Sequence, residues 1–285
     1  MMKSITYLIL ILGFLVSCNN SKSEEKTTEN TVSESIENPT NKIGLSADII
    51  WEQMNPARGD KSPLAGTIWG NRKAEIPTGY IGKFVDGFSS PPHIHNVTYR
   101  AIVMKGLIHN DDPEAENMWM PVGSFWTQPA GESHITSAKG EGTMAYIEID
   151  NGPYLVKPTT ESFDNGERPI NMDASNIVWL DNTQTNWIVT NNQSKISFLW
   201  KNAANIRGVL VKLPKNFKGN IHSKGSVFYG VIIDGNVDYK MPNANASTNL
   251  DAGSYFESTG NSIHQISTTE EALIYIRTND SFKID

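Results

Sequence analysis

The sequence predicts an all-β protein made of two small, similar domains, each an antiparallel barrel or jelly roll. In the body of the chain, short segments rich in Val, Ile, Tyr, Phe and Trp alternate with Gly, Asn, Asp and Pro, as strands alternate with turns. No window shows the spacing of a long amphipathic helix. Features of the first half also recur in the second half at a nearly constant offset. These three observations favour two tandem β domains.

The first 18 residues resemble a bacterial lipoprotein signal and are not expected to belong to the fold. A short positive start precedes an apolar run at residues 5–16, which is shorter than the roughly 20 residues of a membrane-spanning helix. The run ends in Leu-Val-Ser-Cys, and in the lipoprotein class cleavage falls just before this cysteine, which is then lipidated. Cys18 is the only cysteine of the chain. An ordinary signal peptide or a membrane-tethering helix is the alternative.

Lipid chains on Cys18 would hold the protein at a bacterial membrane surface without a membrane-spanning segment. We therefore expect a location at the cell envelope, either on the periplasmic side or at the cell surface. Residues 19–45 are expected to be a flexible tether, because they are mostly polar and contain no aromatic residue. With a single cysteine no internal disulfide can form, and a net charge of −7 argues against nucleic acid as a partner.

The repeat divides the body into an N-terminal domain, residues 46–165, and a C-terminal domain, residues 166–285. The segment Ile-Val-Met-Lys-Gly at 102–106 is echoed by Val-Ile-Ile-Asp-Gly at 231–235. Further pairs, with offsets of 128 to 130 residues, are Trp51 and Trp179, His93 and His222, Gly123 and Gly253, and His134 and His264. The junction near residues 159–169 has the composition of a loop.

Three histidines in the N-terminal domain predict a metal site. His93 and His95 lie two residues apart, and this spacing places both imidazoles on one face of a strand. His134 follows a Pro-Ala-Gly turn. Neutral imidazole binds zinc, iron, nickel and copper, so three convergent rings form a ready site for such ions. A single buried histidine is usually a hydrogen-bonded core residue, but three of the six in the chain are better explained by a metal.

The same residues resemble the two sequence motifs of the cupins. Residues 87–106 follow the spacing of the first motif, with Gly, five residues, His-x-His and a final Gly. Residues 123–134 follow the second, with Gly, five residues, Pro-x-Gly, two residues and His. With the repeat, the chain resembles a bicupin, which has two tandem cupin barrels of the double-stranded β-helix or jelly-roll type. The sequence around these motifs is similar to that of a cupin family known mainly as a domain of unknown function.

The resemblance implies a site made of His93, His95 and His134, without the glutamate that family sites usually add. Tyr99 stands in that position. A tyrosine is neutral near pH 7 and a poor ligand for a divalent ion, although it could donate a hydrogen bond to a bound ligand. Three neutral ligands leave the full charge on the metal, which then attracts anionic, chelating ligands. Iron, zinc, manganese and nickel all remain candidates for this divalent transition metal.

The C-terminal domain retains His222 and His264 but has Lys224 where the second histidine of the pair would stand. Phe228 occupies the position that matches Tyr99. A protonated lysine has no lone pair to give to a metal. We therefore expect a structural domain, or a pocket in which His222, Lys224 and His264 bind an anion, rather than a second metal site.

Two further residues of the N-terminal domain are candidates for a catalytic role. Tyr99 would orient or polarise a ligand bound to the metal, and Glu132 would act as a base unless it is an ordinary solvent-facing carboxylate of the turn. His109 is expected to be a surface-loop histidine or a proton shuttle. Residues 118–120 and 125–126, rich in Met, Trp and Phe, are expected in the core or in the wall of an apolar pocket.

The combined hypothesis is an exported bicupin that binds a divalent metal through three histidines. It would act on a small oxygen-bearing organic molecule as an oxygenase, an isomerase or a hydrolase. The alternative is a non-catalytic module that binds a small anionic or sugar-like ligand. The expected partners are a small molecule and, through the lipid anchor alone, a membrane, with a homodimer left open.

Overall fold

The computed structural model describes residue 36 and residues 38–285. In this part of the chain the protein consists of twenty short and long strands and four 3-10 helices, and the strands form two barrels. The predicted all-β class with two tandem jelly-roll barrels is confirmed. The predicted lipoprotein signal, its Cys18 and residues 19–35 of the predicted tether lie outside the described residues. Within the described part, we find no helix with the length and hydropathy that a bilayer crossing requires.

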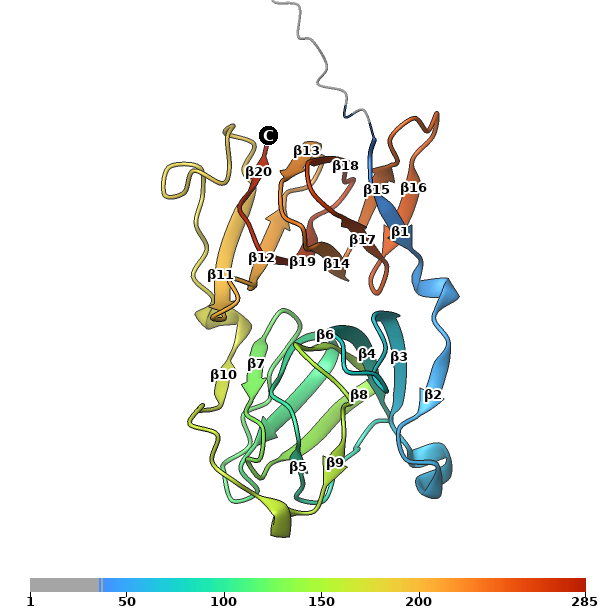
Figure 1. Ribbon diagram of the computed structural model, residues 1–285, viewed down its shortest axis with the longest axis vertical. Coiled ribbons are helices and arrows are strands. Elements are labelled where there is room, and N and C mark those ends of the chain that lie inside the picture. The colour runs from blue at the N-terminus through green and yellow to red at the C-terminus, as the bar shows by residue number, and fades with distance from the viewer. Residues whose placement is uncertain (1–35, 37) are drawn as a thin grey trace, which may run out of the picture. The chain divides into compact units, whose positions relative to one another are not determined.

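The N-terminal barrel contains a seven-stranded sheet and a two-stranded sheet (Figure 1). The larger sheet has the order β10-β7-β6-β8-β4-β3-β2, and the smaller one pairs β5 with β9. The strands are β2 (Trp51–Gln53), β3 (Leu64–Trp69), β4 (Thr78–Phe84), β5 (Ile94–His95), β6 (Tyr99–Asp111), β7 (Phe125–Gln128), β8 (Ile135–Ile149), β9 (Val156–Lys157) and β10 (Ile170–Met172). The 3-10 helices η2 (Pro56–Lys61) and η3 (Thr159–Glu161) lie in the connections.

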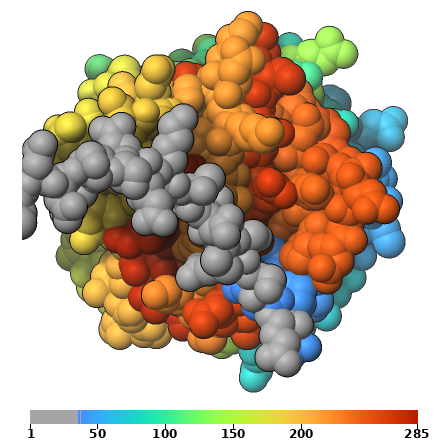
Figure 2. Space-filling view, turned by 90° about the horizontal axis from the view of Figure 1, so that it is seen from above, coloured from blue at the N-terminus to red at the C-terminus, as the bar shows by residue number. Residues whose placement is uncertain are grey.

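The C-terminal barrel has a six-stranded sheet, β1-β17-β14-β19-β12-β11, and a five-stranded sheet, β16-β15-β18-β13-β20. The strands are β1 (Lys42–Gly44), β11 (Lys195–Lys201), β12 (Arg207–Leu213), β13 (Lys218–Ser223), β14 (Phe228–Asp234), β15 (Asn236–Lys240), β16 (Thr248–Asp251), β17 (Tyr255–Ser258), β18 (Ser262–Ser267), β19 (Ala272–Thr278) and β20 (Phe282–Ile284). Helices η1 (Ser46–Asp48) and η4 (Ala174–Asn176) precede the two barrels in corresponding places. In Figure 2, the segments coloured orange and red form most of this barrel's surface as seen from above.

The long strands β6 and β8 form a bent hairpin that carries much of the N-terminal barrel. Residues 99–103 pair with 145–149, and residues 107–111 pair with 135–139, with irregular register between the two stretches. At the bend Gly106 has a φ of 74°, and a Cβ atom there would lie 2.2 Å from the Thr143 hydroxyl. Only glycine combines this left-handed conformation with so close an approach. The repeated Gly235 has a φ of 78° and separates β14 from β15.

Each barrel completes its large sheet with a strand from the segment that precedes the other barrel. Strand β1 comes before the N-terminal barrel but pairs with β17, and β10 comes after residue 165 but pairs with β7. Residues 42–44 therefore belong to the C-terminal barrel and not to a flexible tether, and residues 170–172 belong to the N-terminal sheet. The sequence could not reveal this exchange, because a three-residue strand at a sheet edge has no pattern that names its partner.

Three clusters of buried side chains form the hydrophobic core. One fills the N-terminal barrel, and a second fills the C-terminal barrel. The third draws residues from both, among them Ile102, Tyr146, Val231 and Tyr275. Because this shared cluster is continuous across the two large sheets, burial of apolar surface, worth about 25 cal/mol per Å², stabilises the contact between the barrels.

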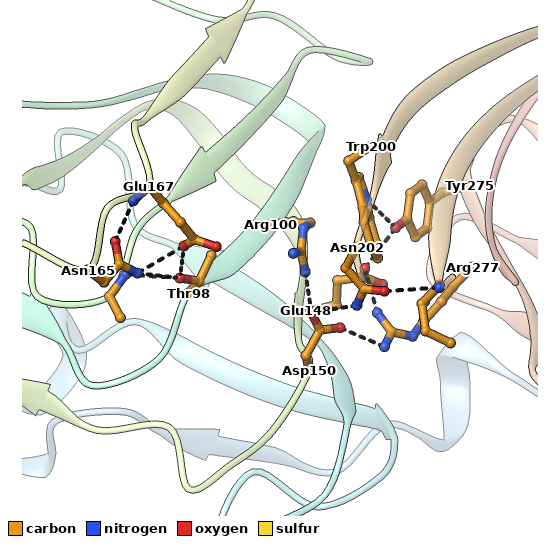
Figure 3. Close-up of polar contacts among 12 residues, drawn as sticks. Thr98, Arg100, Glu148, Asp150, Asn165, Glu167, Trp200, Asn202, Tyr275 and Arg277 are labelled. Atoms are coloured by element: carbon orange, nitrogen blue, oxygen red, sulfur yellow. Dashed lines mark hydrogen bonds and ion pairs between the residues drawn. The ribbon is translucent and has the colours of Figure 1, made fainter. Parts of the chain in front are cut away.

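A buried ion pair lies within the contact between the barrels (Figure 3). Arg277 Nη1 lies 3.0 Å from Glu148 Oε1, and the two side chains are 3% and 1% exposed. Arg277 Nη2 also donates to Asp150, which accepts from Arg100 as well. The tyrosine hydroxyl of Tyr275 donates to Glu148 at 2.8 Å. Glu148 and Arg277 are equivalent positions of the repeat. The N-terminal barrel therefore has a negative residue, and the C-terminal barrel a positive one, at the same place in the contact.

Candidate metal centre

Backbone pairing brings the three predicted histidines of the N-terminal barrel together. His93 and His134 exchange two backbone hydrogen bonds of 3.0 Å, which places their side chains next to each other. His95 lies on β5, where its carbonyl accepts the backbone N–H of Gly131 at 2.8 Å. The turn that contains Gly131 therefore bonds to His95 and leads directly into the segment of His134. Gly131 has a φ of 79°.

The rings of the three histidines converge. One nitrogen from each of His93, His95 and His134 forms a group whose members all lie within 4.8 Å of one another. The ring centroids are 4.3 to 5.1 Å apart. His95 and His134 are buried and His93 is half-buried. This geometry is that of a three-histidine metal site.

Backbone carbonyls determine which nitrogen of each ring carries no hydrogen. Nδ1 lies 2.9 Å from the Pro91 carbonyl in His93, 3.0 Å from that of Leu155 in His95, and 3.1 Å from that of Glu132 in His134. A carbonyl can only accept, so each Nδ1 carries the hydrogen and each Nε2 keeps its lone pair. Such outer contacts are how proteins orient histidine ligands.

The residues present fit a bound metal ion. Nε2 of His134 is buried and has no hydrogen-bond partner, an arrangement that costs free energy unless something else occupies its lone pair. Burial lowers the pKa of His134 to about 3 and holds the pKa of His95 well below its usual value. Burial, and then the Arg58 charge, also lower the pKa of His93. All three rings are therefore neutral near pH 7, as metal ligands must be.

A cavity of about 250 Å³ opens beside His93 and His95. Most of the residues in its wall are apolar or aromatic. They are Met54, Asn55, Arg58, Pro63, Tyr80, Phe84, Phe88, Ser90, Pro91, His93, His95, Tyr99, Trp126, Thr136, Ile147, Tyr154 and Val156. The predicted wall residue Trp126 is among them, whereas Met120 lies in the core and Phe125 in the cluster shared by the two barrels.

Residues 42–285 match the family described as "Domain of unknown function (DUF4437)". The chain belongs to this family. Curated proteins include no significant match.

Solved structures share the fold at low sequence identity. A provisionally assigned dioxygenase from Nostoc punctiforme is 16% identical, with a TM-score of 0.63 over 87% of this chain and 83% of that one. Oxalate decarboxylase from Lactobacillus farciminis, in a formate complex, is 11% identical, with a TM-score of 0.56 over 88% and 89%. A salicylate 1,2-dioxygenase variant from Pseudoaminobacter salicylatoxidans, in complex with gentisate, is 11% identical, with a TM-score of 0.55 over 85% and 82%. These likenesses show the cupin fold.

Tyr99, predicted to orient or polarise a metal-bound ligand, lies in the cavity wall, but its hydroxyl donates to a residue of the protein. The hydroxyl donates to Asn110 Oδ1 at 2.8 Å and accepts a longer bond from Trp126. Burial raises the pKa of Tyr99 to about 12, so the phenol stays neutral. Asn110 is held in turn by Gln128 and Thr136. Tyr99 therefore belongs to a fixed polar network behind the site.

Glu132 contributes to the site through its backbone. Its carbonyl accepts from His134 Nδ1 and, at 3.3 Å, from the side chain of Gln128. Its carboxylate is not part of the cavity wall, and lies with Asp164 and Arg168 at a separate surface depression. Nothing in this position supports the predicted role of Glu132 as a base.

Tyr154 has no role in the sequence-based prediction, yet it contacts His95, one of the three predicted metal ligands. Its ring stacks on that of His95 with centroids 4.3 Å apart, and its hydroxyl lies 3.0 Å from His95 Nε2. Since Nδ1 of His95 carries the hydrogen, Nε2 accepts from the tyrosine. Tyr154 therefore occupies the lone pair that a metal would need. It stands in a loop 59 residues from His95, and no local pattern marks it.

The predicted anion pocket of the C-terminal barrel has a different arrangement. His264 is fully buried, contacts the hydroxyls of Tyr239 and Ser258 at 2.7 and 3.0 Å, and stacks on Phe228. His222 instead lies 2.7 Å from Asp285, and Lys224 is exposed. The three side chains thus have separate environments.

His109 corrects an expectation. It lies on β6 and is 1% exposed, so it is not a surface-loop histidine. Trp119, from the loop that follows the strand, packs beside it with ring centroids 5.9 Å apart. Loop packing of this kind depends on tertiary structure and leaves no local signal in the sequence. His109 is absent from the cavity wall, so the structure offers no support for a proton shuttle.

Proposed function

We propose that the N-terminal barrel is a metal-dependent catalytic domain in which His93, His95 and His134 bind a divalent transition metal. The observation that carries this proposal is the set of three Nε2 atoms that Nδ1–carbonyl hydrogen bonds leave without a hydrogen, beside a cavity. The fold of the solved dioxygenases and oxalate decarboxylase supports a substrate that is a small oxygen-bearing organic molecule. Iron, zinc and nickel suit imidazole ligands, and manganese is a candidate because an oxalate decarboxylase of this fold contains Mn(II) centres.

The chain's own residues prepare the site in three ways. Backbone carbonyls hold the histidine rings in one orientation, and low pKa values keep them neutral. The apolar wall excludes water, which strengthens electrostatic interactions within the cavity. When bound, a metal held by neutral ligands would supply a strong positive charge that polarises oxygen atoms of a substrate.

Among the three reaction classes, oxidation by dioxygen receives the most support. Among the residues that the structure describes, none in the cavity wall carries a carboxylate, and hydrolysis or isomerisation commonly uses one as a general base. The phenols are poor substitutes, because burial raises the pKa of Tyr99 to about 12 and holds the pKa of Tyr154 well above its usual value. An oxygenase needs no basic side chain in the wall if the substrate binds as an anion.

Export as a lipoprotein is a second part of the proposal. It is supported by the apolar run at residues 5–16 and by the Leu-Val-Ser-Cys sequence that ends at Cys18. In bacteria labelled with a radioactive fatty acid, the full-length chain should carry label and a Cys18→Ala variant should not. Label that persists in the variant, or a wild-type chain recovered without label, would contradict the lipid anchor.

Metal content tests the proposed site. The full-length chain should hold about one metal ion per chain by elemental analysis, and a variant with His93→Ala and His134→Ala should hold none while retaining its circular dichroism spectrum. His222→Ala, which changes a histidine of the other barrel, is the matched control and should retain the ion. A metal-free wild-type protein after anaerobic, chelator-free purification would favour the non-catalytic binding module.

Oxygen consumption then separates an enzyme from a binding module that contains a metal. Metal-loaded wild-type protein should take up dioxygen when mixed with a substrate, and the double histidine variant should not. Binding of benzoate, cyclohexanecarboxylate, benzyl alcohol or oxalate without any uptake of dioxygen would support the module.

A further inference from the structure

The cavity beside the histidines has a single permanently charged side chain in its wall. Arg58 provides this charge, because the other described residues of the wall include no lysine, aspartate or glutamate and no second arginine. The rest of the wall is dominated by aromatic and aliphatic groups such as Phe84, Phe88 and Ile147. A molecule that fits this space must bury apolar surface and can make one strong contact with a cation.

Arg58 is held at the cavity by its own contacts. It lies in η2, with its guanidinium 5.2 Å from the centre of the Phe88 ring. Nη2 donates to the Ser89 carbonyl at 3.4 Å, which is a weak bond and leaves most of its donors for a ligand. A guanidinium of this kind matches a carboxylate through two parallel hydrogen bonds.

Most hydroxyl groups in the wall already form hydrogen bonds with other groups of the protein. The hydroxyls of Tyr99 and Thr136 donate to Asn110, that of Tyr154 contacts His95, and that of Ser90 accepts the Thr136 backbone N–H. Among the wall hydroxyls of the described structure, only that of Tyr80 is both buried and without a partner. A sugar would therefore bury several hydroxyls that find no partner, at a cost of about 1–3 kcal/mol for each.

We propose that the ligand of this site is a monocarboxylate about one ring in size, whose apolar body packs against the aromatic wall and whose carboxylate is recognised by Arg58. This inference rests on the proposed function for the place where the ligand reacts. It goes beyond that function in naming the class of molecule and the residue that selects it.

Size and charge both support this class. A volume of about 250 Å³ is smaller than the roughly 300–1,000 Å³ of sites for drug-sized ligands. A metal cation held by the three histidines, with Arg58 nearby, would make the site positive, and the described wall holds no carboxylate to offset that charge, so an anion is favoured. Oxalate is an anion but has no apolar body, and it would leave the aromatic wall unfilled.

Calorimetric titration of the full-length chain tests the inference with four probes. Benzoate and cyclohexanecarboxylate carry one carboxylate on an apolar ring, benzyl alcohol has the ring without the charge, and oxalate has the charge without the ring. Both monocarboxylates should bind at least about tenfold more tightly than the other two. Oxalate binding as tight as that of benzoate would overturn the inference.

Variants of Arg58 provide the second arm. Arg58→Gln should weaken benzoate binding by roughly tenfold, as expected for loss of a charge-assisted hydrogen bond, and should leave benzyl alcohol unchanged. Arg58→Lys should restore part of the loss. Lys61→Gln removes the same charge from the exposed end of the same helix and should change nothing. An equal effect of Arg58→Gln and Lys61→Gln on benzoate would contradict recognition by Arg58.

Metal content, measured on the same samples, separates this inference from the proposed function. If the wild-type chain holds no metal, the proposed function fails, but the ratio between wild type and Arg58→Gln can still be measured with metal-free protein. If metal is bound and benzoate is not preferred, the ligand class is wrong and the metal site stands.

Discussion

The two barrels place a histidine at the same position of the repeat and give it opposite surroundings. In the N-terminal barrel, Nε2 of His134 is buried without a partner beside two other imidazoles. In the C-terminal barrel, both ring nitrogens of His264 have hydroxyl partners, Tyr239 on one side and Ser258 on the other. A histidine at the motif position is therefore not enough for a metal site. What matters is whether its neighbours leave the lone pair free.

The neighbours that make this difference are themselves equivalent positions. Asn110 matches Tyr239 and Gln128 matches Ser258, at offsets of 129 and 130 residues. In the N-terminal barrel the two amides bond to each other, Asn110 also accepts from Tyr99, and neither amide bonds to His134 Nε2. In the C-terminal barrel the corresponding hydroxyls turn to the histidine. Two barrels of the same fold thus have different centres, a candidate metal site in one and a hydrogen-bonded core in the other, depending on which polar groups face the histidine.

Metal affinity should give the largest difference between the two histidines. His134→Ala removes one of three ligands and should weaken metal binding by at least about 100-fold, a loss beyond the 10–100-fold that outer contacts contribute. His264→Ala should leave the affinity unchanged, since its ring lies in the other barrel. Titration with a competing chelator measures both variants. Equal affinities for wild type and His134→Ala would show that the metal site is not the one described.

Stability should respond in the opposite order. His264→Ala leaves a cavity among aromatic rings and strands the hydroxyls of Tyr239 and Ser258, so it should lower the free energy of unfolding by about 3 kcal/mol or more. His134→Ala removes a buried ring nitrogen that has no hydrogen-bond partner and strands no hydroxyl, so it should cost less, about 1 kcal/mol in metal-free protein. Guanidinium unfolding curves of both variants test this contrast. A larger loss for His134→Ala would mean that the N-terminal cluster is structural.

Much of this organisation can be predicted from sequence, because it depends on local patterns. Each of three features is defined by a few neighbouring residues. They are the two-residue spacing of His93 and His95, the turn before His134 and the glycine at position 106. The offset of the repeat gives the number of barrels. All of these features depend on the period of a strand or on a backbone angle, which neighbouring residues determine.

Other features depend on contacts between distant segments and were not predictable. Tyr154 reaches His95 from a loop, and the exchange of β1 and β10 depends on which sheet edge lies nearby. The sequence shows that Lys224 replaces a histidine, but it does not show that the Tyr239 hydroxyl contacts His264. Such outcomes depend on side-chain packing across the barrel, where sequence separation carries no information.

Acid should destabilise the metal-free protein through its buried histidines. Burial lowers the pKa of His264 to about 3, whereas an unfolded histidine has a pKa of about 6.5. The unfolded state therefore binds a proton first, and stability present above pH 6.5 is lost as the pH falls from there toward 3. Between pH 7 and pH 5 the loss from His264 should be about 2 kcal/mol.

A glutamine at this position isolates that contribution. His264→Gln retains a polar group able to contact Tyr239 or Ser258 but does not titrate, so its free energy of unfolding should fall by about 2 kcal/mol less than that of wild type between pH 7 and pH 5. Guanidinium unfolding at the two pH values, with chelator present, measures the difference. Parallel losses in wild type and variant would mean that His264 becomes protonated in the folded state near pH 5.

Substitution of Tyr154 should give the smallest change in metal affinity, and the direction of that change tests whether the tyrosine competes with the metal. Its hydroxyl competes for the His95 lone pair, so Tyr154→Phe should bind metal a few-fold more tightly, in line with the loss of one neutral hydrogen bond of about 1 kcal/mol. Tyr99→Phe is the matched control, because the Tyr99 hydroxyl bonds to Asn110 and not to a ligand nitrogen. It should leave metal affinity within about twofold of wild type. If Tyr154→Phe bound metal more weakly instead, the phenol would be a fourth ligand, and the site would no longer consist of neutral imidazoles alone.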